Sequence, residues 1–305
     1  MDKVKVAIVG PGNIGTDLMM KVLKSDYLEM SAMIGVVDSP GIQRAREMGF
    51  IVTTEGISYL EKHPDLAEIV FDATSAKVHE EINAPVLKKL DKYAIDLTPA
   101  AVGPLVSPIV NMQDALSVRN VNVITCAGQA GTPIIKAITD LIPIKYVELV
   151  SCSASKGVGR GSRLNNDEFV ATTGRAYCQL GGAASAKVVP VIQPAVPEVN
   201  MRNTLYLVPE DGYEVTEELL HKIRENVDVT VKKIQEYVPG YELTFAPVLH
   251  ASLDGTLKYI TLCVSVEGAG DFLPKYAGNL DIMTSSAIKI AEEYAKKYQK
   301  GELAK

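Results

Sequence analysis

One cysteine of this chain lies where chemistry is expected. Residues 120–125 read as a β-strand that ends at Cys126, and small residues follow it before a helix that we expect to start near Thr132. A nearby helix N-terminus lowers the pKa of a thiol and raises its thiolate fraction. The sequence therefore predicts that Cys126 is a nucleophile, with Gln129 and neighbouring backbone N–H groups as an oxyanion hole. The alternative is a buried structural cysteine, which is our interpretation of the three that lie within apolar runs: Cys152, Cys178 and Cys263.

A second pattern with chemical meaning opens the chain. Residues 4–9 read as an apolar strand, and a G-x-G-x-x-G loop and a helical pattern follow it. Such a loop places a pyrophosphate on a helix N-terminus, where unpaired backbone N–H groups and the helix dipole favour an anion. We therefore expect the loop residues to bind a dinucleotide: Gly10, Pro11, Gly12, Asn13, Ile14 and Gly15.

An acidic residue completes this pattern. A second predicted strand, residues 30–37, ends in Asp38. A carboxylate at that place accepts hydrogen bonds from the adenosine ribose and repels a 2′-phosphate, so the sequence favours NAD over NADP.

A thiolate beside a nicotinamide favours one reaction. The sulfur attacks an aldehyde to give a thiohemiacetal, whose carbon passes a hydride to the oxidised nicotinamide. An acyl thioester then remains on the enzyme until a second nucleophile takes the acyl group.

The predicted elements divide into two kinds. Up to about residue 127, strands and amphipathic helices alternate, one helix covering 76–90, and this alternation is typical of a parallel, doubly wound α/β sheet of the Rossmann type. Residues 128–279 contain longer strands with two helices, near 166–180 and 215–235, and predict an α+β domain with a mostly antiparallel or mixed sheet and helices on one face. We expect the last helix, within 280–305, to pack back on the first domain.

Composition restricts the class of protein. The chain has 305 residues, 47% of them hydrophobic, and a net charge of −6, which argues against non-specific nucleic-acid binding. No apolar run approaches the length of a membrane span, and the first strand begins too early to leave room for a signal peptide. The four cysteines fit no metal or redox spacing, so we expect no metal site and a cytoplasmic protein with reduced thiols.

Over nearly its whole length the chain resembles the acylating acetaldehyde dehydrogenases of bacterial aromatic meta-cleavage pathways. The most specific stretches are Gly12–Met19, Phe71–Ala76, Asp96–Ala101, Asn122–Cys126, Asp167–Phe169, Tyr237–Tyr241 and Tyr276–Ser285. The resemblance implies a fold like that of glyceraldehyde-phosphate and semialdehyde dehydrogenases, with an α+β substrate and dimerisation domain. It also implies the conversion of acetaldehyde, NAD and coenzyme A to acetyl-coenzyme A and NADH.

The same resemblance implies roles for individual residues. Cys126 matches the family's nucleophile, and Asn279 matches a residue whose amide is suited to the nicotinamide carboxamide. A homo-oligomer and a 4-hydroxy-2-oxovalerate aldolase as partner are implied as well. The implied cofactor loop comprises Gly157, Val158, Gly159, Arg160, Gly161, Ser162, Arg163, Leu164 and Asn165.

The chain departs from the family at one predicted catalytic position. Asn203 follows Met201 and Arg202 where the family has Met-Arg-Asp, and an amide cannot take up a proton at neutral pH. Two alternatives therefore stay open. One is a semialdehyde or acyl-phosphate reductase that uses phosphate in place of coenzyme A, with His250 as the base. The other is a catalytically silent NAD-binding paralogue. We expect the remaining histidines in capping or surface roles: His63, His79 and His221.

Overall fold

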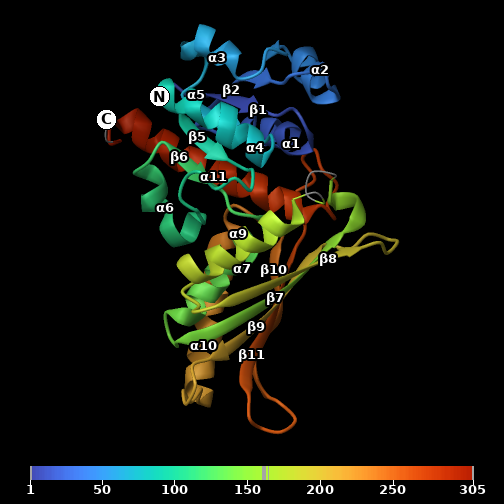
Figure 1. Ribbon diagram of the computed structural model, residues 1–305, viewed down its shortest axis with the longest axis vertical. Coiled ribbons are helices and arrows are strands. Elements are labelled where there is room, and N and C mark those ends of the chain that lie inside the picture. Colours follow the sequence, from blue (N-terminus) through green and yellow to red (C-terminus); the bar gives the residue numbers. More distant parts are fainter. Residues whose placement is uncertain (1, 160–162, 164, 304–305) are drawn as a thin grey trace. The chain divides into compact units, whose positions relative to one another are not determined.

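The computed structural model describes residues 2–159, 163 and 165–303, which form two compact units (Figure 1). Unit 1 contains the chain up to Ile124, the short segment Asp271–Leu273 and the residues from Met283 onward. Unit 2 contains Thr125–Gly270 and Pro274–Ile282. The division places residues 125–127 at the start of unit 2, whereas we expected the first domain to end at residue 127.

A parallel sheet of six strands forms the centre of unit 1, in the order β3-β2-β1-β4-β5-β6. Its middle strands are apolar and buried, as expected for a sheet with helices on both faces. The doubly wound, Rossmann-like architecture predicted from the alternating pattern is therefore confirmed. The strands are β1 (Val4–Val9), β2 (Leu28–Ile34), β3 (Ile51–Thr53), β4 (Ile69–Asp72), β5 (Tyr93–Asp96) and β6 (Asn120–Asn122).

The helices of unit 1 differ from prediction in one segment. Residues 76–90 do not form one regular helix, because α4 (Ala76–Val78) and α5 (Ala84–Lys89) flank a π-helical turn, His79–Asn83. The other helices are α1 (Asn13–Val22), α2 (Pro40–Glu47), α3 (Ser58–Lys62), a 3₁₀ turn (Pro64–Leu66), α6 (Pro108–Leu116) and, mostly within this unit, α11 (Gly278–Lys300).

Unit 2 is built on a mixed sheet of five strands in the order β10-β11-β9-β7-β8. All neighbours are antiparallel except β7 and β8, which are parallel. The predicted mixed sheet is thus confirmed. The strands are β7 (Ile144–Ala154), β8 (Ala186–Gln193), β9 (Met201–Pro209), β10 (Tyr241–Ala251) and β11 (Lys258–Val266).

Three long helices of unit 2 pack beside one another on one side of this sheet (Figure 1). They are α7 (Cys126–Thr139), α9 (Asn166–Gln179) and α10 (Glu217–Gln235), and a 3₁₀ turn, Ser155–Gly157, follows β7. The middle helix, α7, contacts both of the others and β9. Among the described helices, none combines the length and the apolar composition that a membrane span requires.

Candidate active site

The backbone of the glycine loop after β1 has a conformation that requires glycine at two positions. Gly10 has a φ of +101°, and a Cβ there would lie 2.5 Å from the carbonyl oxygen of Ala73. A Cβ on Gly15 would lie 2.1 Å from the carbonyl oxygen of Gly10. At Gly12 a Cβ would meet no atom within 4 Å, so this position is open. The loop therefore leaves free space at Gly12, the N-cap of α1, which is where a pyrophosphate would have to lie.

The segment after β2 exposes apolar side chains beside an acid, because β2 ends at Ile34 and not at residue 37 as we predicted. Val36 and Val37 are 76% and 63% exposed, and Asp38 follows them. Hydrogen bonds from Arg46 and Gln43 lower the pKa of Asp38, which keeps this group a carboxylate. Exposed valines beside an acceptor suit an adenine ring and its ribose, so the structure provides the kind of surface that the NAD prediction needs.

Cys126 is the first residue of α7, so our expectation that this helix starts near Thr132 is wrong. Thr125 caps the helix, because its side-chain oxygen accepts a hydrogen bond of 3.0 Å from the N–H of Gly128. Packing of α7 between α9 and α10 outweighs the low helix propensity of Gly128 and Gly131, which follow. Cys126 therefore lies within the N-terminal turn itself. The residue as a whole is partly exposed, while its sulfur is surrounded by protein atoms.

Buried hydroxyl groups hold this turn in place. The Thr125 and Thr173 hydroxyl oxygens lie 2.6 Å apart. The Tyr177 hydroxyl donates to the carbonyl oxygen of Ala127 at 2.9 Å, and the Tyr241 hydroxyl donates to that of Ala130 at 2.7 Å. These contacts fix the position of the backbone that carries Cys126.

The protonation of Cys126 differs from our prediction. Burial raises the pKa of the thiol to about 12, although the backbone N–H groups of Ala127 and of Cys126 itself favour the thiolate. The predicted lowering of this pKa is thus wrong for the unliganded protein, because loss of water around the sulfur outweighs the helix N-terminus. The two N–H groups remain a suitable setting for negative charge at this point.

Two predicted catalytic side chains of unit 2 are buried. Gln129 lies one turn after Cys126 on α7 and is 1% exposed. Asn203 lies in β9, fully buried, and its Oδ1 and Nδ2 atoms both lack a hydrogen-bond partner among the described residues. An unsatisfied buried amide costs about 1–3 kcal/mol, so the unpartnered amide of Asn203 is an unfavourable feature of β9.

The structure brings together two residues that we predicted to bind the cofactor and that lie far apart in the sequence. Asn279 Nδ2 donates a hydrogen bond of 3.0 Å to the carbonyl oxygen of Gly157, although 122 residues separate them in sequence. A Cβ at Gly157 would lie 3.0 Å from Asn279 Oδ1, so glycine permits this approach. Asn279 Oδ1 is buried and has no partner among the described residues, which leaves an acceptor available to an amide donor.

The rest of the predicted cofactor loop is described only in part. Arg163 donates to the carbonyl oxygens of Ser155 and Val158, so its guanidinium is engaged by the loop itself. Gly159 is exposed, with no atom within 4 Å of where its Cβ would be, and Asn165 precedes α9. The remaining predictions lie outside the described residues: Arg160, Gly161, Ser162 and Leu164.

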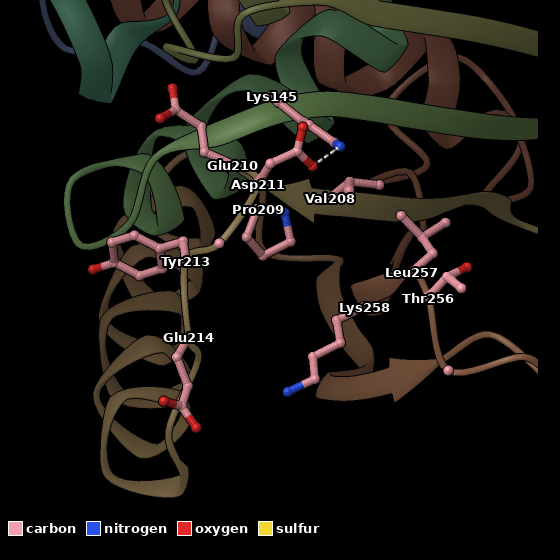
Figure 2. Close-up of a pocket in the computed structure, with 12 residues that line it drawn as sticks. Lys145, Val208, Pro209, Glu210, Asp211, Tyr213, Glu214, Thr256, Leu257 and Lys258 are labelled. Atoms are coloured by element: carbon pink, nitrogen blue, oxygen red, sulfur yellow. Dashed lines mark hydrogen bonds and ion pairs between the residues drawn. The ribbon is translucent and has the colours of Figure 1, made fainter.

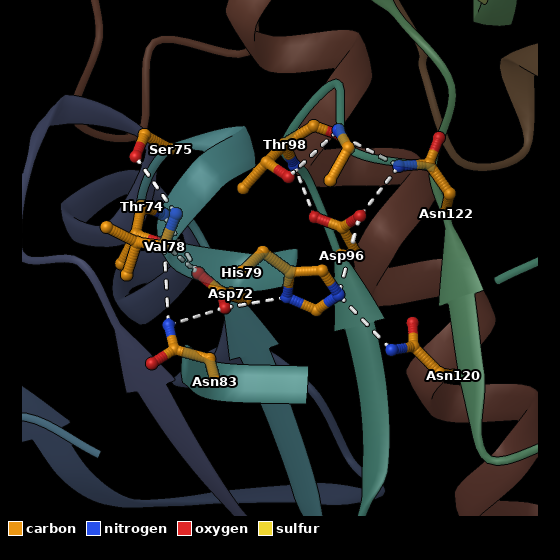
Figure 3. Close-up of polar contacts among 11 residues, drawn as sticks. Asp72, Thr74, Ser75, Val78, His79, Asn83, Asp96, Thr98, Asn120 and Asn122 are labelled. Atoms are coloured by element: carbon orange, nitrogen blue, oxygen red, sulfur yellow. Dashed lines mark hydrogen bonds and ion pairs between the residues drawn. The ribbon is translucent and has the colours of Figure 1, made fainter. Parts of the chain in front are cut away.

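Sequence reasoning missed a buried polar cluster at the carboxyl ends of β4, β5 and β6 (Figure 3). His79, for which we expected a capping or surface role, is fully buried. Its Nδ1 lies 2.8 Å from Asp72 Oδ2 and its Nε2 lies 3.6 Å from Asp96 Oδ2. Burial alone would lower the pKa of His79, but the two carboxylates outweigh it and raise this pKa. The available signal was an aspartate ending each of two apolar strands.

The histidine of the phosphate-using alternative lies elsewhere in unit 2. His250 belongs to β10, and its ring stacks on Tyr259 with 5.4 Å between the centroids. His63 follows α3 and His221 lies on α10, both exposed as expected.

One cavity of unit 2 does not coincide with these residues. It has a volume of about 280 Å³ and lies between the end of β9 and the β10–β11 turn (Figure 2). Lys145 and Asp211 form an ion pair at its edge. Its described lining contains no cysteine or histidine, so we assign it no catalytic part. Among the described residues, no group of three or more His, Cys, Asp or Glu side chains could hold a metal ion.

Comparison with known proteins gives a consistent result. Residues 126–274 match the family model described as prokaryotic acetaldehyde dehydrogenase, dimerisation. An acetaldehyde dehydrogenase of Geobacillus stearothermophilus is 50% identical over 97% of both chains, and one of Carboxydothermus hydrogenoformans is 45% identical over 100% of this chain and 97% of its own. An aspartate semialdehyde dehydrogenase II of Vibrio cholerae, solved in complex with ASA, has a TM-score of 0.62 at 14% identity, with 97% of this chain and 100% of that chain covered. That likeness confirms the predicted semialdehyde dehydrogenase-like fold.

Proposed function

Because the chain belongs to the prokaryotic acetaldehyde dehydrogenase family, we propose that it converts acetaldehyde, NAD and coenzyme A to acetyl-coenzyme A and NADH. The observation that carries the proposal is the place of Cys126 in the first turn of α7, partly exposed and beside two backbone N–H groups. The family membership identifies an oxidoreductase; the roles of NAD, coenzyme A and the individual residues are our proposal.

The residues present fit a dinucleotide. The open position at Gly12 and the tight contacts of Gly10 and Gly15 suit a pyrophosphate at the start of α1. Asp38 suits the adenosine ribose, and the unpartnered Oδ1 of Asn279 suits the carboxamide N–H of a nicotinamide. When bound, the oxidised nicotinamide accepts the hydride that the reaction releases.

Cys126 performs the covalent step. Its Sγ forms a bond to the aldehyde carbon, and the carbonyl oxygen gains the electron pair of the broken π bond. The buried amide of Gln129 and the backbone N–H groups of the first turn of α7 stabilise the resulting oxyanion. Loss of the hydride from that carbon leaves an acetyl thioester on Cys126. The thiol of coenzyme A then attacks the thioester, and Sγ leaves as the acetyl group is transferred.

The Cys126 thiol must lose its proton before the sulfur can attack the aldehyde. A thiol with a pKa of about 12 is almost wholly protonated at neutral pH, so its proton must leave as the substrates bind. Asn203 cannot receive that proton, but its buried amide can both donate and accept a hydrogen bond. We therefore assign Asn203 to holding substrate or coenzyme A, not to acid–base catalysis.

The matched family model describes a dimerisation region, which indicates a homo-oligomer. An aldolase that supplies the aldehyde is a further part of the proposal, as is a cytoplasmic location.

The test is NADH formation from acetaldehyde and NAD, with coenzyme A or inorganic phosphate as the acyl acceptor. We expect turnover with coenzyme A, none with phosphate, and loss of turnover in Cys126→Ser. The matched control is Cys152→Ser, a partly exposed thiol in β7 that we expect to be dispensable. Turnover only with phosphate would instead support the acyl-phosphate alternative, and NAD binding without turnover would support the silent paralogue.

A further inference from the structure

We infer that the guanidinium of Arg46 could bind a 2′-phosphate, and that its ion pair with Asp38 prevents this. The site therefore accepts NAD and rejects NADP. This inference rests on the proposed dinucleotide site, which it refines by naming the pair of residues that decides between the two cofactors.

Both carboxylate oxygens of Asp38 accept a hydrogen bond from a side chain. Arg46 Nη2 donates to Oδ1 at 2.8 Å, and Gln43 Nε2 donates to Oδ2 at 3.2 Å. Both donors lie on α2, which begins directly after Asp38 and its neighbour Ser39, the N-cap of the helix. All of these residues belong to unit 1, next to the exposed valines that suit an adenine ring.

Stability does not explain this pair. The side chains of Arg46 and Asp38 are 53% and 51% exposed, and ion pairs that are this exposed contribute little to stability. An ionised carboxylate offers about four lone-pair directions, of which Arg46 and Gln43 use two. The others remain for ribose hydroxyl groups, so Asp38 can hold Arg46 and a ribose together.

Charge then decides the choice of cofactor. Asp38 and Arg46 sum to no net charge, while a phosphate monoester carries about −1.5 to −2 and would approach the carboxylate directly. Without the carboxylate, the guanidinium would present free donors in the planar arrangement that matches phosphate oxygens. Arg46 therefore provides an attraction for the 2′-phosphate of NADP, and Asp38 cancels that attraction.

The same helix offers a matched control. Arg44 carries the same charge two residues earlier, but its guanidinium lies 5.1 Å from the centroid of the Phe272 ring and makes a cation–π contact there. A general effect of positive charge on α2 would involve Arg44 and Arg46 alike, whereas direct ligation of a 2′-phosphate involves Arg46 alone.

The experiment compares Asp38→Ser, Arg46→Gln, Asp38→Ser/Arg46→Gln and Asp38→Ser/Arg44→Gln with the unaltered protein. Calorimetric titration with adenosine 2′,5′-bisphosphate and with adenosine 5′-monophosphate measures binding without turnover, and kcat/KM for NADP and NAD measures the effect on the reaction. We expect Asp38→Ser to bind the bisphosphate at least ~10-fold more tightly and to raise the NADP:NAD ratio of kcat/KM by ~100-fold. The gain should weaken as salt is added.

The combined variants decide the outcome. The gain must disappear in Asp38→Ser/Arg46→Gln and persist in Asp38→Ser/Arg44→Gln; a gain that survives without Arg46, or that also requires Arg44, overturns the inference. Asp38→Asn, which keeps the side-chain shape, repeats the test should the serine variant fold poorly. If the unaltered protein binds neither NAD nor the monophosphate, the proposed cofactor site fails; if it binds NAD but Asp38→Ser and Asp38→Asn gain nothing, only this inference fails.

Discussion

The side-chain Oδ1 of Asn122 accepts a hydrogen bond of 2.9 Å from the backbone N–H of Ile124, whose φ is +59°. A left-handed conformation is an outlier for a β-branched residue and costs about 1–3 kcal/mol. Asn122 also donates to Asp96 Oδ2 and to the carbonyl oxygen of Thr98, as Figure 3 shows. The strained turn two residues before Cys126 is therefore held by the buried cluster at the strand ends.

This arrangement makes Asn122 important for stability. Asn122→Ala would remove three buried hydrogen bonds, to Asp96 Oδ2, to the Thr98 carbonyl oxygen and from the Ile124 N–H, and we expect the free energy of unfolding to fall by about 3 kcal/mol. Urea denaturation measures this change. Asn166→Ala, at the exposed first residue of α9, is the control and should change stability by less than about 0.5 kcal/mol. Equal effects of the two changes would contradict the account of the cluster.

Gly131 tests the packing that fixes the nucleophile's helix. A Cβ at Gly131 would lie 2.2 Å from the Tyr177 hydroxyl oxygen. That hydroxyl donates a hydrogen bond to the carbonyl oxygen of Ala127 in α7. Gly131→Ala should therefore lower stability by about 1–3 kcal/mol and reduce kcat. Gly174→Ala, in α9 with nothing within 4 Å of the added Cβ, should instead raise stability by about 0.5–1 kcal/mol. Thermal unfolding of both variants checks the signs, and a stabilising Gly131→Ala would refute the packing argument.

Asn203 should show opposite effects on stability and activity. Asn203→Leu removes two buried polar atoms that lack partners, so we expect stability to rise by about 1–2 kcal/mol. If Asn203 holds a substrate, kcat/KM for coenzyme A should fall at least ~10-fold in the same variant. Denaturant titration and initial rates measure the two effects. A variant that is more stable and fully active would leave Asn203 without its proposed role.

The thiol of Cys126 should react slowly in the unliganded protein. Because burial raises its pKa to about 12, the thiolate fraction stays small and grows about tenfold per pH unit across the alkaline range. In a variant with serine at the other three cysteines, we expect iodoacetamide labelling to keep accelerating above pH 9. Labelling of N-acetylcysteine amide, a thiol with an ordinary pKa of about 8.5, should instead level off as the pH passes that value. A plateau near pH 7 for Cys126 would mean that the helix N-terminus outweighs burial.

The sequence was sufficient for features that local patterns determine. The glycine loop and the alternation of strands and helices depend on nearby residues, and the observed elements agree with them. The strand predicted to end in Asp38 exists, but β2 ends at Ile34, four residues before Asp38. The start of α7 and the burial of His79 were not predictable in this way. Both depend on contacts between residues far apart in sequence: Thr125 with Thr173, and His79 with Asp72 and Asp96 across neighbouring strands. The raised pKa of Cys126 has the same origin, because burial by the folded chain cannot be read from flanking residues.

The acyl-enzyme itself gives the most direct test of the central claim. Incubation of the protein with acetyl-coenzyme A alone, without NADH, allows transfer of the acetyl group to the nucleophile and no further reaction. Mass spectrometry of the digested protein should then locate one acetyl group on the peptide that contains Cys126, removable by hydroxylamine and absent from Cys126→Ser. An acetyl group on Cys152, Cys178 or Cys263 instead, or no acyl-enzyme in a protein that turns over acetaldehyde, would contradict the assignment of Cys126.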